Sequence, residues 1–139
     1  MERMLFINLA VDDLPAALVF YERIGAVRNR QFADDSCAMV SFSHCINVIL
    51  MTHERLRTMT ARPIAPRGMS EVLLCLSSES RGAVDALAAA AAEAGGELDP
   101  CVVQDHGYMY SRSFTDLDGH VWETVWMDPS VAQSGSETA

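Results

Sequence analysis

The residue whose type and setting best suit chemistry is Glu123, near the end of an alternating run. Period-2 alternation places Val121, Glu123 and Val125 on one face of a predicted strand and Trp122 and Trp126 on the other. Large tryptophan side chains suit a face that a helix covers, which leaves the carboxylate pointing into a cavity. An apolar setting disfavours the charged form of a carboxyl group, the condition for a general base near neutral pH. The alternative is a structural ion pair with Arg112 on the neighbouring strand, and the sequence leaves both roles open.

A second acidic residue, Glu71, opens an apolar run and shares a predicted face with Leu73 and Cys75. It is either a cavity carboxylate or the solvated end of a strand. If Glu71 and Glu123 face one cavity, their charges repel, so one of them holds a proton or both share a cation.

Polar and aromatic groups gather in residues 105–112. Gly107 permits a tight entry into a strand, Tyr108 and Tyr110 then fall on one face, and His106 lies just ahead of them. His106 could donate a proton or hydrogen-bond a substrate oxygen. The alternative is an exposed turn histidine with tyrosines that fill a sheet–helix core; we favour ligand contact.

Several other kinds of chemistry are excluded by composition. All ten cationic residues are arginine, so a Schiff-base lysine, a pyridoxal phosphate anchor and a P-loop lysine are impossible. The net charge of −9 opposes binding to nucleic acid, whose phosphates need a basic surface. No Ser-His-Asp spacing, nucleophile elbow or glycine-rich phosphate loop is present.

Two further patterns lack the spacing that metal sites need. Residues 116–119 begin like a calcium loop, but its twelfth position is Met127 instead of a glutamate, so we expect a turn. His44 and His53 have no ligand spacing to other donors and are interpreted as surface residues.

The elements that must position these residues follow the same order twice. The first half predicts a strand over Met4–Val11, a helix over Leu14–Ile24 and three strands, at 27–32, 37–42 and 46–52. The second half predicts a strand, a helix and three strands at 70–77, 78–94, 97–103, 107–114 and 120–126. We therefore expect one domain over 1–139, with modules at 4–52 and 70–128, a connector at 53–69 and a disordered tail at 129–139. Without a signal peptide or a membrane-length apolar run, we expect a cytoplasmic protein.

Two segments resemble the vicinal oxygen chelate superfamily, which includes glyoxalase I, extradiol dioxygenases and bleomycin resistance proteins. Val11–Gly25 is similar to its opening and Phe114–Glu123 to its last hairpin, while Gln104–Tyr110 resembles a predicted lactoylglutathione lyase branch. The resemblance implies an α+β fold in which two βαβββ modules form a curved mixed sheet around one cavity, in a homodimer that binds a small molecule.

Metal-dependent members of this superfamily hold a divalent ion with one residue from the first and last strand of each module. By resemblance those positions fall on Phe6, Leu50, Glu71 and Glu123. Phenylalanine and leucine cannot ligate a metal, so the usual site is incomplete. Glu71 and Glu123 could hold Mg²⁺ or Mn²⁺ only weakly, and no cofactor is certain.

The resemblance favours a glyoxalase-I-like protein that acts on a small oxygenated or thiol-conjugated molecule. Glu123 would move a proton next to a carbonyl, and a cation, or His106 with Tyr108, would stabilise the enediolate oxygen.

The alternative is a non-catalytic binding protein similar to the bleomycin resistance members. Phe6 and Leu50 would then form cavity wall, and Tyr108 and Tyr110 would stack on the ligand. The charge of −9 would favour a cationic guest.

Overall fold

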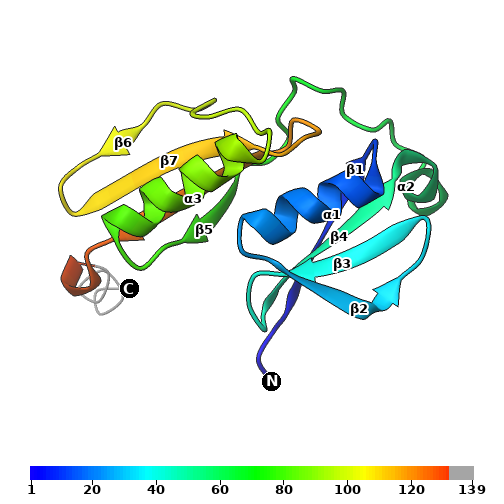
Figure 1. Cartoon of the computed structure of the whole chain (residues 1–139), viewed down its shortest axis with the longest axis horizontal. Coiled ribbons are helices and arrows are strands. Elements are labelled where there is room, and N and C mark those ends of the chain that lie inside the picture. The colour runs from blue at the N-terminus through cyan, green and yellow to red at the C-terminus, as the bar shows by residue number, and fades with distance from the viewer. Residues whose placement is uncertain (132–139) are drawn as a thin grey trace. The chain divides into compact units, whose positions relative to one another are not determined.

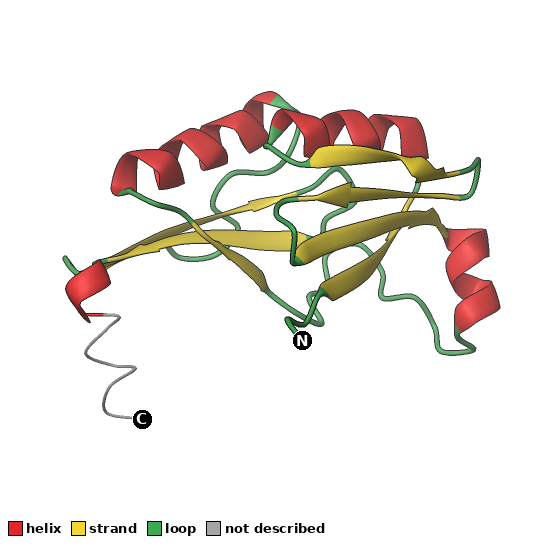
Figure 2. Cartoon of the chain, turned by 90° about the horizontal axis from the view of Figure 1, so that it is seen from below, coloured by secondary structure: helices red, strands yellow, loops and turns green. Residues whose placement is uncertain are grey.

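A computed structural model describes residues 1–131 of the chain. These residues form two compact units (Figure 1), and Figure 2 shows their helices and strands in separate colours. The first contains residues 1–71 with 116–120, and the second contains 72–115 with the strand that begins at Val121. Each unit has a four-stranded mixed sheet and the βαβββ order that the sequence predicts. The α+β expectation with two such modules is therefore confirmed.

The first unit consists of β1 (Leu5–Val11), α1 (Leu14–Arg23), β2 (Val27–Ala33), β3 (Cys37–Ser41) and β4 (Ile46–Thr52). The sheet order is β1-β4-β3-β2, with β1 parallel to β4. Helix α1 begins where the side chain of Asp13 accepts a hydrogen bond from the Ala16 N–H at 3.0 Å. It ends before Gly25, which has a φ of +105°, a conformation that glycine adopts with little strain because it has no Cβ.

Helix α1 covers one face of this sheet, and an ion pair identifies that face. Arg28 of β2 binds Glu22 of α1, so Arg28 points toward the helix. Arg28 is paired in register with Val40, which is paired with Val48, and both valines are fully buried. Alternation then places Leu50, also fully buried, on the helix-covered face.

The segment predicted as an irregular connector begins with a short helix, α2 (His53–Met59). Thr52, the last residue of β4, caps it by accepting the Arg55 N–H at 3.1 Å. No residue of α2 is buried, which explains why the sequence shows no helical apolar period there.

The second unit consists of β5 (Leu74–Ser77), α3 (Arg81–Glu93), β6 (Gln104–Asp105), β7 (Met109–Thr115) and β8 (Val121–Met127). The sheet order is β5-β8-β7-β6. Val84, Ala88 and Ala91 form the buried stripe of α3. The fully buried side chains of this unit include Phe114 and Trp122.

Two predicted strands are wrong in extent. Instead of a strand over 97–103 there is one bridge, Leu98 to Phe114, and the ladder resumes only in the two-residue strand β6. Asp99 has a φ of +55° and the next residue, Pro100, has no N–H, so the chain cannot remain in the ladder there. The strand predicted over 70–77 begins only at Leu74.

The predicted tail at 129–139 lies largely outside the described residues, which end at residue 131. Among the residues described, no helix is both long and apolar enough to cross a lipid bilayer.

Candidate functional site

Glu123 lies on the face of β8 that carries no helix. Its register partners are Ser113 of β7 on one side and Cys75 of β5 on the other. The side chain is half-buried, whereas Trp122 on the opposite face is 1% exposed. The alternation predicted for this strand is therefore confirmed.

Glu123 acts electrostatically on Cys75. Desolvation at the sheet surface raises the pKa of the Cys75 thiol, and the negative charge of Glu123 raises it further. A carboxylate and a thiol therefore lie side by side on one face of the second unit.

Arg112 and Tyr110 lie on the other face, toward α3. Both side chains bind Asp85 of that helix, with the Tyr110 hydroxyl donating at 2.6 Å and Arg112 Nη1 at 3.2 Å. Arg112 also binds Asp99 through two nitrogens, at 2.7 and 3.2 Å, and this contact is the main reason that its pKa is raised. The alternative role left open for Glu123, an ion pair with Arg112, is therefore wrong, because Tyr110 and Arg112 lie on the opposite face of the sheet from Glu123.

His106 and Tyr108 lie at the far end of the β7–β8 hairpin from Glu123. The His106 N–H donates to the Met109 carbonyl, and the His106 ring is stacked near that of exposed Tyr108, with centroids 6.2 Å apart. Met109 is four residues before Ser113, the register partner of Glu123, which places it about 13 Å away along the strand. The structure therefore does not bring His106 and Tyr108 together with Glu123.

The remaining predicted residues occupy three different settings. Glu71 is exposed and precedes β5, so it is not part of a strand. Phe6 is 47% exposed, and its register partner is Asn47, which places it on the helix-free face of the first sheet. Leu50 faces α1 and is completely buried, so the prediction that it forms cavity wall is wrong: its position is one residue out of register with that face.

These placements also test whether the chain fits the divalent metal of the superfamily. Phe6 carries no donor atom, and Leu50 neither carries one nor faces the helix-free side of its sheet. Within residues 1–131, no group of three or more His, Cys, Asp or Glu side chains is arranged to hold a metal ion. The residues present do not fit a three-ligand metal centre. A weak Mg²⁺ or Mn²⁺ site at Glu71 and Glu123 stays a prediction.

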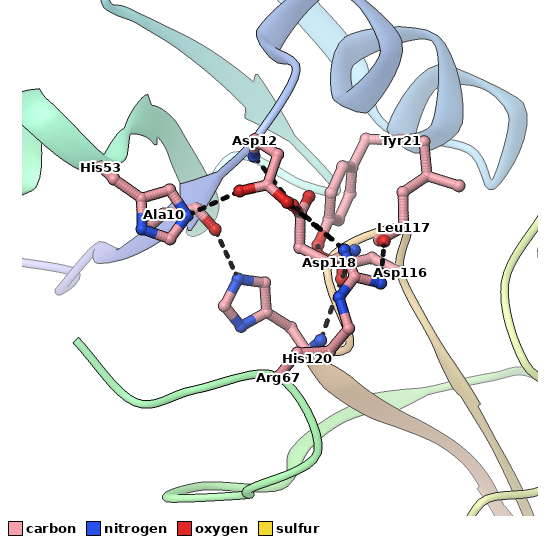
Figure 3. Close-up of polar contacts among 9 residues, drawn as sticks. All are labelled: Ala10, Asp12, Tyr21, His53, Arg67, Asp116, Leu117, Asp118 and His120. Carbon is pink, nitrogen blue, oxygen red and sulfur yellow. Dashed lines mark hydrogen bonds and ion pairs between the residues drawn. The ribbon is translucent and has the colours of Figure 1, made fainter.

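The first unit contains a cavity that sequence reasoning missed, with a volume of about 410 Å³, at the carboxyl end of β1. Its polar walls come from β1, α2, the segment after α2 and the turn at 116–120, and they carry Asp12, His53, Arg57, Arg67, Asp118 and His120. Figure 3 shows how the contacts of Asp12 link several of these side chains. His53, interpreted from sequence as a surface residue, lies 3.0 Å from the Asp12 carboxylate through Nε2.

The turn beside this cavity is held by its own hydrogen bonds. Asp116 Oδ1 accepts the N–H groups of Asp118 and His120, each at 2.9 Å, which confirms the predicted turn. His120 Nε2 lies 2.7 Å from the carbonyl oxygen of Ala10. Because a carbonyl only accepts, Nε2 carries the proton. One sequence feature could have pointed to this cavity: residues 53–69 contain four of the ten arginines.

Comparisons with known proteins give structural neighbours only. No family model matches the chain, and no curated protein matches it. A hypothetical protein from S. aureus is 25% identical, with a TM-score of 0.75 over 91% of this chain and 94% of that one. A glyoxalase/bleomycin resistance protein/dioxygenase family enzyme from Burkholderia phytofirmans PsJN is 18% identical, with a TM-score of 0.77 over 91% and 99%.

The fosfomycin resistance protein FosX from Listeria monocytogenes is also similar, with 18% identity and a TM-score of 0.66 over 91% of each chain. The structural neighbours are thus glyoxalase/bleomycin resistance/dioxygenase proteins, and the chain has their fold. The resemblance seen in Val11–Gly25 and Phe114–Glu123 is confirmed at the level of the fold.

Proposed function

We propose that the protein binds a small organic molecule on the helix-free face of the second sheet, in contact with Glu123. The observation that carries the proposal is the half-buried carboxylate of Glu123 between Cys75 and Ser113, on a face whose other β8 residues are the apolar Val121, Val125 and Met127. An apolar surface with a few polar groups is typical of small-molecule sites. Structural neighbours named for resistance to bleomycin or fosfomycin support a binding role.

The positions of His106 and Arg112 favour binding without catalysis over a proton shuttle. A proton shuttle next to a carbonyl needs a base and a group that stabilises the enediolate oxygen within reach of the same few atoms. Met109, whose carbonyl accepts the His106 N–H, lies about 13 Å along the strand from the register partner of Glu123, and His106 precedes it in the chain. Arg112 lies on the opposite face of the sheet, where it binds Asp85 and Asp99. Neither residue can therefore help Glu123 with one small substrate.

The second candidate is glyoxalase-like proton transfer, which rests on the same half-buried carboxylate. Glu123 would take a proton from the hydroxyl-bearing carbon next to a carbonyl and return it to the carbonyl carbon, while the hydroxyl proton passes to the former carbonyl oxygen. The substrate is thereby isomerised without net gain or loss of atoms. Residues 1–131 do not fit a three-ligand metal centre, so no step is assigned to a metal.

Two measurements together distinguish the two candidate functions: ligand binding and substrate turnover. Amide chemical shifts of the ¹⁵N-labelled protein would be followed during titration with bleomycin, with fosfomycin and with a fragment library. The hemithioacetal of methylglyoxal and glutathione would be assayed for turnover. Glu123→Gln is the test variant, and Glu93→Gln, an exposed acid at the end of α3, is the matched control.

We expect shifts on β5, β7 and β8, an affinity about tenfold lower in Glu123→Gln, and no turnover. Unchanged affinity in Glu123→Gln, or shifts confined to other parts of the chain, would overturn the proposal. Turnover that is lost in Glu123→Gln and kept in Glu93→Gln would establish the second candidate instead.

A further inference from the structure

The acidic side chains of the cavity in the first unit already have partners. The carboxylate of Asp12 lies 3.0 Å from His53 Nε2 and 3.5 Å from Arg67 Nη2. Asp118 is 10% exposed and accepts the N–H of Asp12 at 2.8 Å. Both carboxylates are therefore engaged with protein groups, and neither is left to attract a cation.

The two arginines of the cavity differ in how they are held. Arg67 Nη1 donates to the carbonyl oxygen of Leu117 at 2.7 Å, and Nη2 faces Asp12 and Asp118 (Figure 3). Arg57, on the last turn of α2, also lines the cavity. In the part of the chain that the structure describes, no hydrogen bond or ion pair joins the Arg57 side chain to another residue. Arg57 is thus a cation at the cavity wall without a protein counter-charge.

The charge of the surrounding segment also favours an anionic ligand. Residues 53–69 contain four arginines and one glutamate, although the whole chain has a net charge of −9. Two of these arginines, Arg57 and Arg67, line the cavity. Arg67 is held by Asp12 and Asp118, so Arg57 is the positive charge that remains open to an anion.

The remaining walls are apolar. They are formed by Pro63, Ile64, Ala65 and Pro66, and Ile64 is half-buried. A ligand that fills the cavity therefore contacts hydrocarbon as well as charge. The cavity volume of about 410 Å³ suits a molecule of small-metabolite size.

We propose that this cavity binds a small aliphatic monocarboxylate, with its carboxylate on Arg57 and its chain against Ile64 and the neighbouring prolines. A guanidinium binds a carboxylate through two parallel hydrogen bonds, which gives both strength and orientation. A dianion such as phosphate fits less well, because Arg57 is the one unpaired cation among the described lining residues and Asp12 is close by. The inference concerns the first unit and does not depend on Glu123.

Sodium hexanoate is a suitable probe, and amide chemical shifts of the ¹⁵N-labelled full-length protein are a suitable readout. With eight non-hydrogen atoms, hexanoate is expected to bind with a Kd of about 1 mM, so a titration to about 20 mM reaches saturation. Ionic strength is kept constant with NaCl. Hexanol and inorganic phosphate are titrated in parallel, because hexanol has the hydrocarbon chain without the charge and phosphate has the charge without the chain.

The shifts are expected in residues 53–67 and 116–120, with hexanol and phosphate each binding at least about tenfold more weakly than hexanoate. Arg57→Gln should weaken hexanoate about tenfold, and Arg57→Lys by less. Arg62→Gln is the matched control: it removes the same charge from the same exposed segment, but Arg62 does not line the cavity. Ile64→Asn should weaken hexanoate more than acetate, because it removes only the hydrocarbon contact.

Three results would overturn the proposal. They are the absence of shifts in both segments, equal losses in Arg57→Gln and Arg62→Gln, and phosphate binding as tightly as hexanoate. Glu123→Gln should leave hexanoate binding unchanged, so failure of this inference and failure of the proposed function are distinguishable.

Discussion

The hydroxyl of Tyr21 donates a 2.6 Å hydrogen bond to Oδ2 of Asp116, although the two residues are 95 positions apart in the chain. Both are buried, at 0% and 3% exposed. The other carboxylate oxygen of Asp116 accepts the N–H groups of Asp118 and His120. Helix α1 and the 116–120 turn are thus joined by a single carboxylate, and this turn forms one wall of the cavity.

Replacing Tyr21 by phenylalanine should lower the free energy of unfolding by about 2 kcal/mol, because a buried carboxylate oxygen loses its donor. Urea unfolding followed by circular dichroism measures the change. Tyr108→Phe is the control, since Tyr108 is 48% exposed, and should change stability by less than about 0.5 kcal/mol. If Tyr21→Phe were as stable as the parent protein, the hydrogen bond to Asp116 would make no net contribution to the free energy of unfolding.

Asp118 should make stability depend on pH. Burial raises the pKa of Asp118 above its value in the unfolded chain, and the charges of Asp116 and Asp12 raise it further. The folded state therefore binds this proton more tightly, and stability is lost as pH rises from the ordinary aspartate range through the raised pKa. Asp118→Asn keeps an oxygen to accept the Asp12 N–H and cannot ionise, so it should be more stable than the parent protein at pH 7.

The gain in Asp118→Asn should shrink as pH falls toward about 4, where the parent carboxyl also becomes protonated. Thermal unfolding at a series of pH values measures it. Asp35→Asn, at an exposed position, is the matched control for the removal of one carboxylate. A gain that grows on acidification would contradict the assigned direction.

Gly119 should tolerate a side chain less well than Gly107. Both have positive φ, +88° and +78°, so alanine at either position costs about 1 kcal/mol in backbone strain. At Gly119 the added Cβ would also lie 3.1 Å from Cγ of Arg67, whereas at Gly107 it would meet nothing within 4 Å. Denaturant unfolding of both variants should show the larger loss for Gly119→Ala, and equal losses would mean that Arg67 moves aside freely.

Cys75 provides a chemical probe of Glu123. Because the charge of Glu123 contributes to the raised pKa of Cys75, Glu123→Gln should lower that pKa and speed alkylation of Cys75 by iodoacetamide at pH 8. We expect an increase of about two- to threefold, measured by peptide mass spectrometry. Cys45, whose pKa is raised mainly by a hydrogen bond to Glu2, is an internal control in the same sample. An unchanged rate at Cys75 would show that the two side chains do not interact in solution.

The order of elements was accessible from sequence because its signals are local. Asp13 and Gly25 define the ends of α1, and the alternation from Val121 to Val125 sets the faces of β8. The strand predicted over 97–103 failed at Asp99 and Pro100, where backbone conformation and a missing donor interrupt an otherwise apolar run.

The sequence by itself determined the two βαβββ modules, the exclusion of lysine chemistry and the helix-free setting of Glu123. Only the tertiary structure decided that Leu50 faces a helix, that Arg112 binds Asp85 and Asp99, and that residues of four segments form one cavity. The physical reason is that strand register and ion pairing depend on groups far apart in the chain, and a shift of one residue reverses the face of every side chain. Local sequence patterns specify the helices and strands, whereas tertiary packing determines which side chains are in contact.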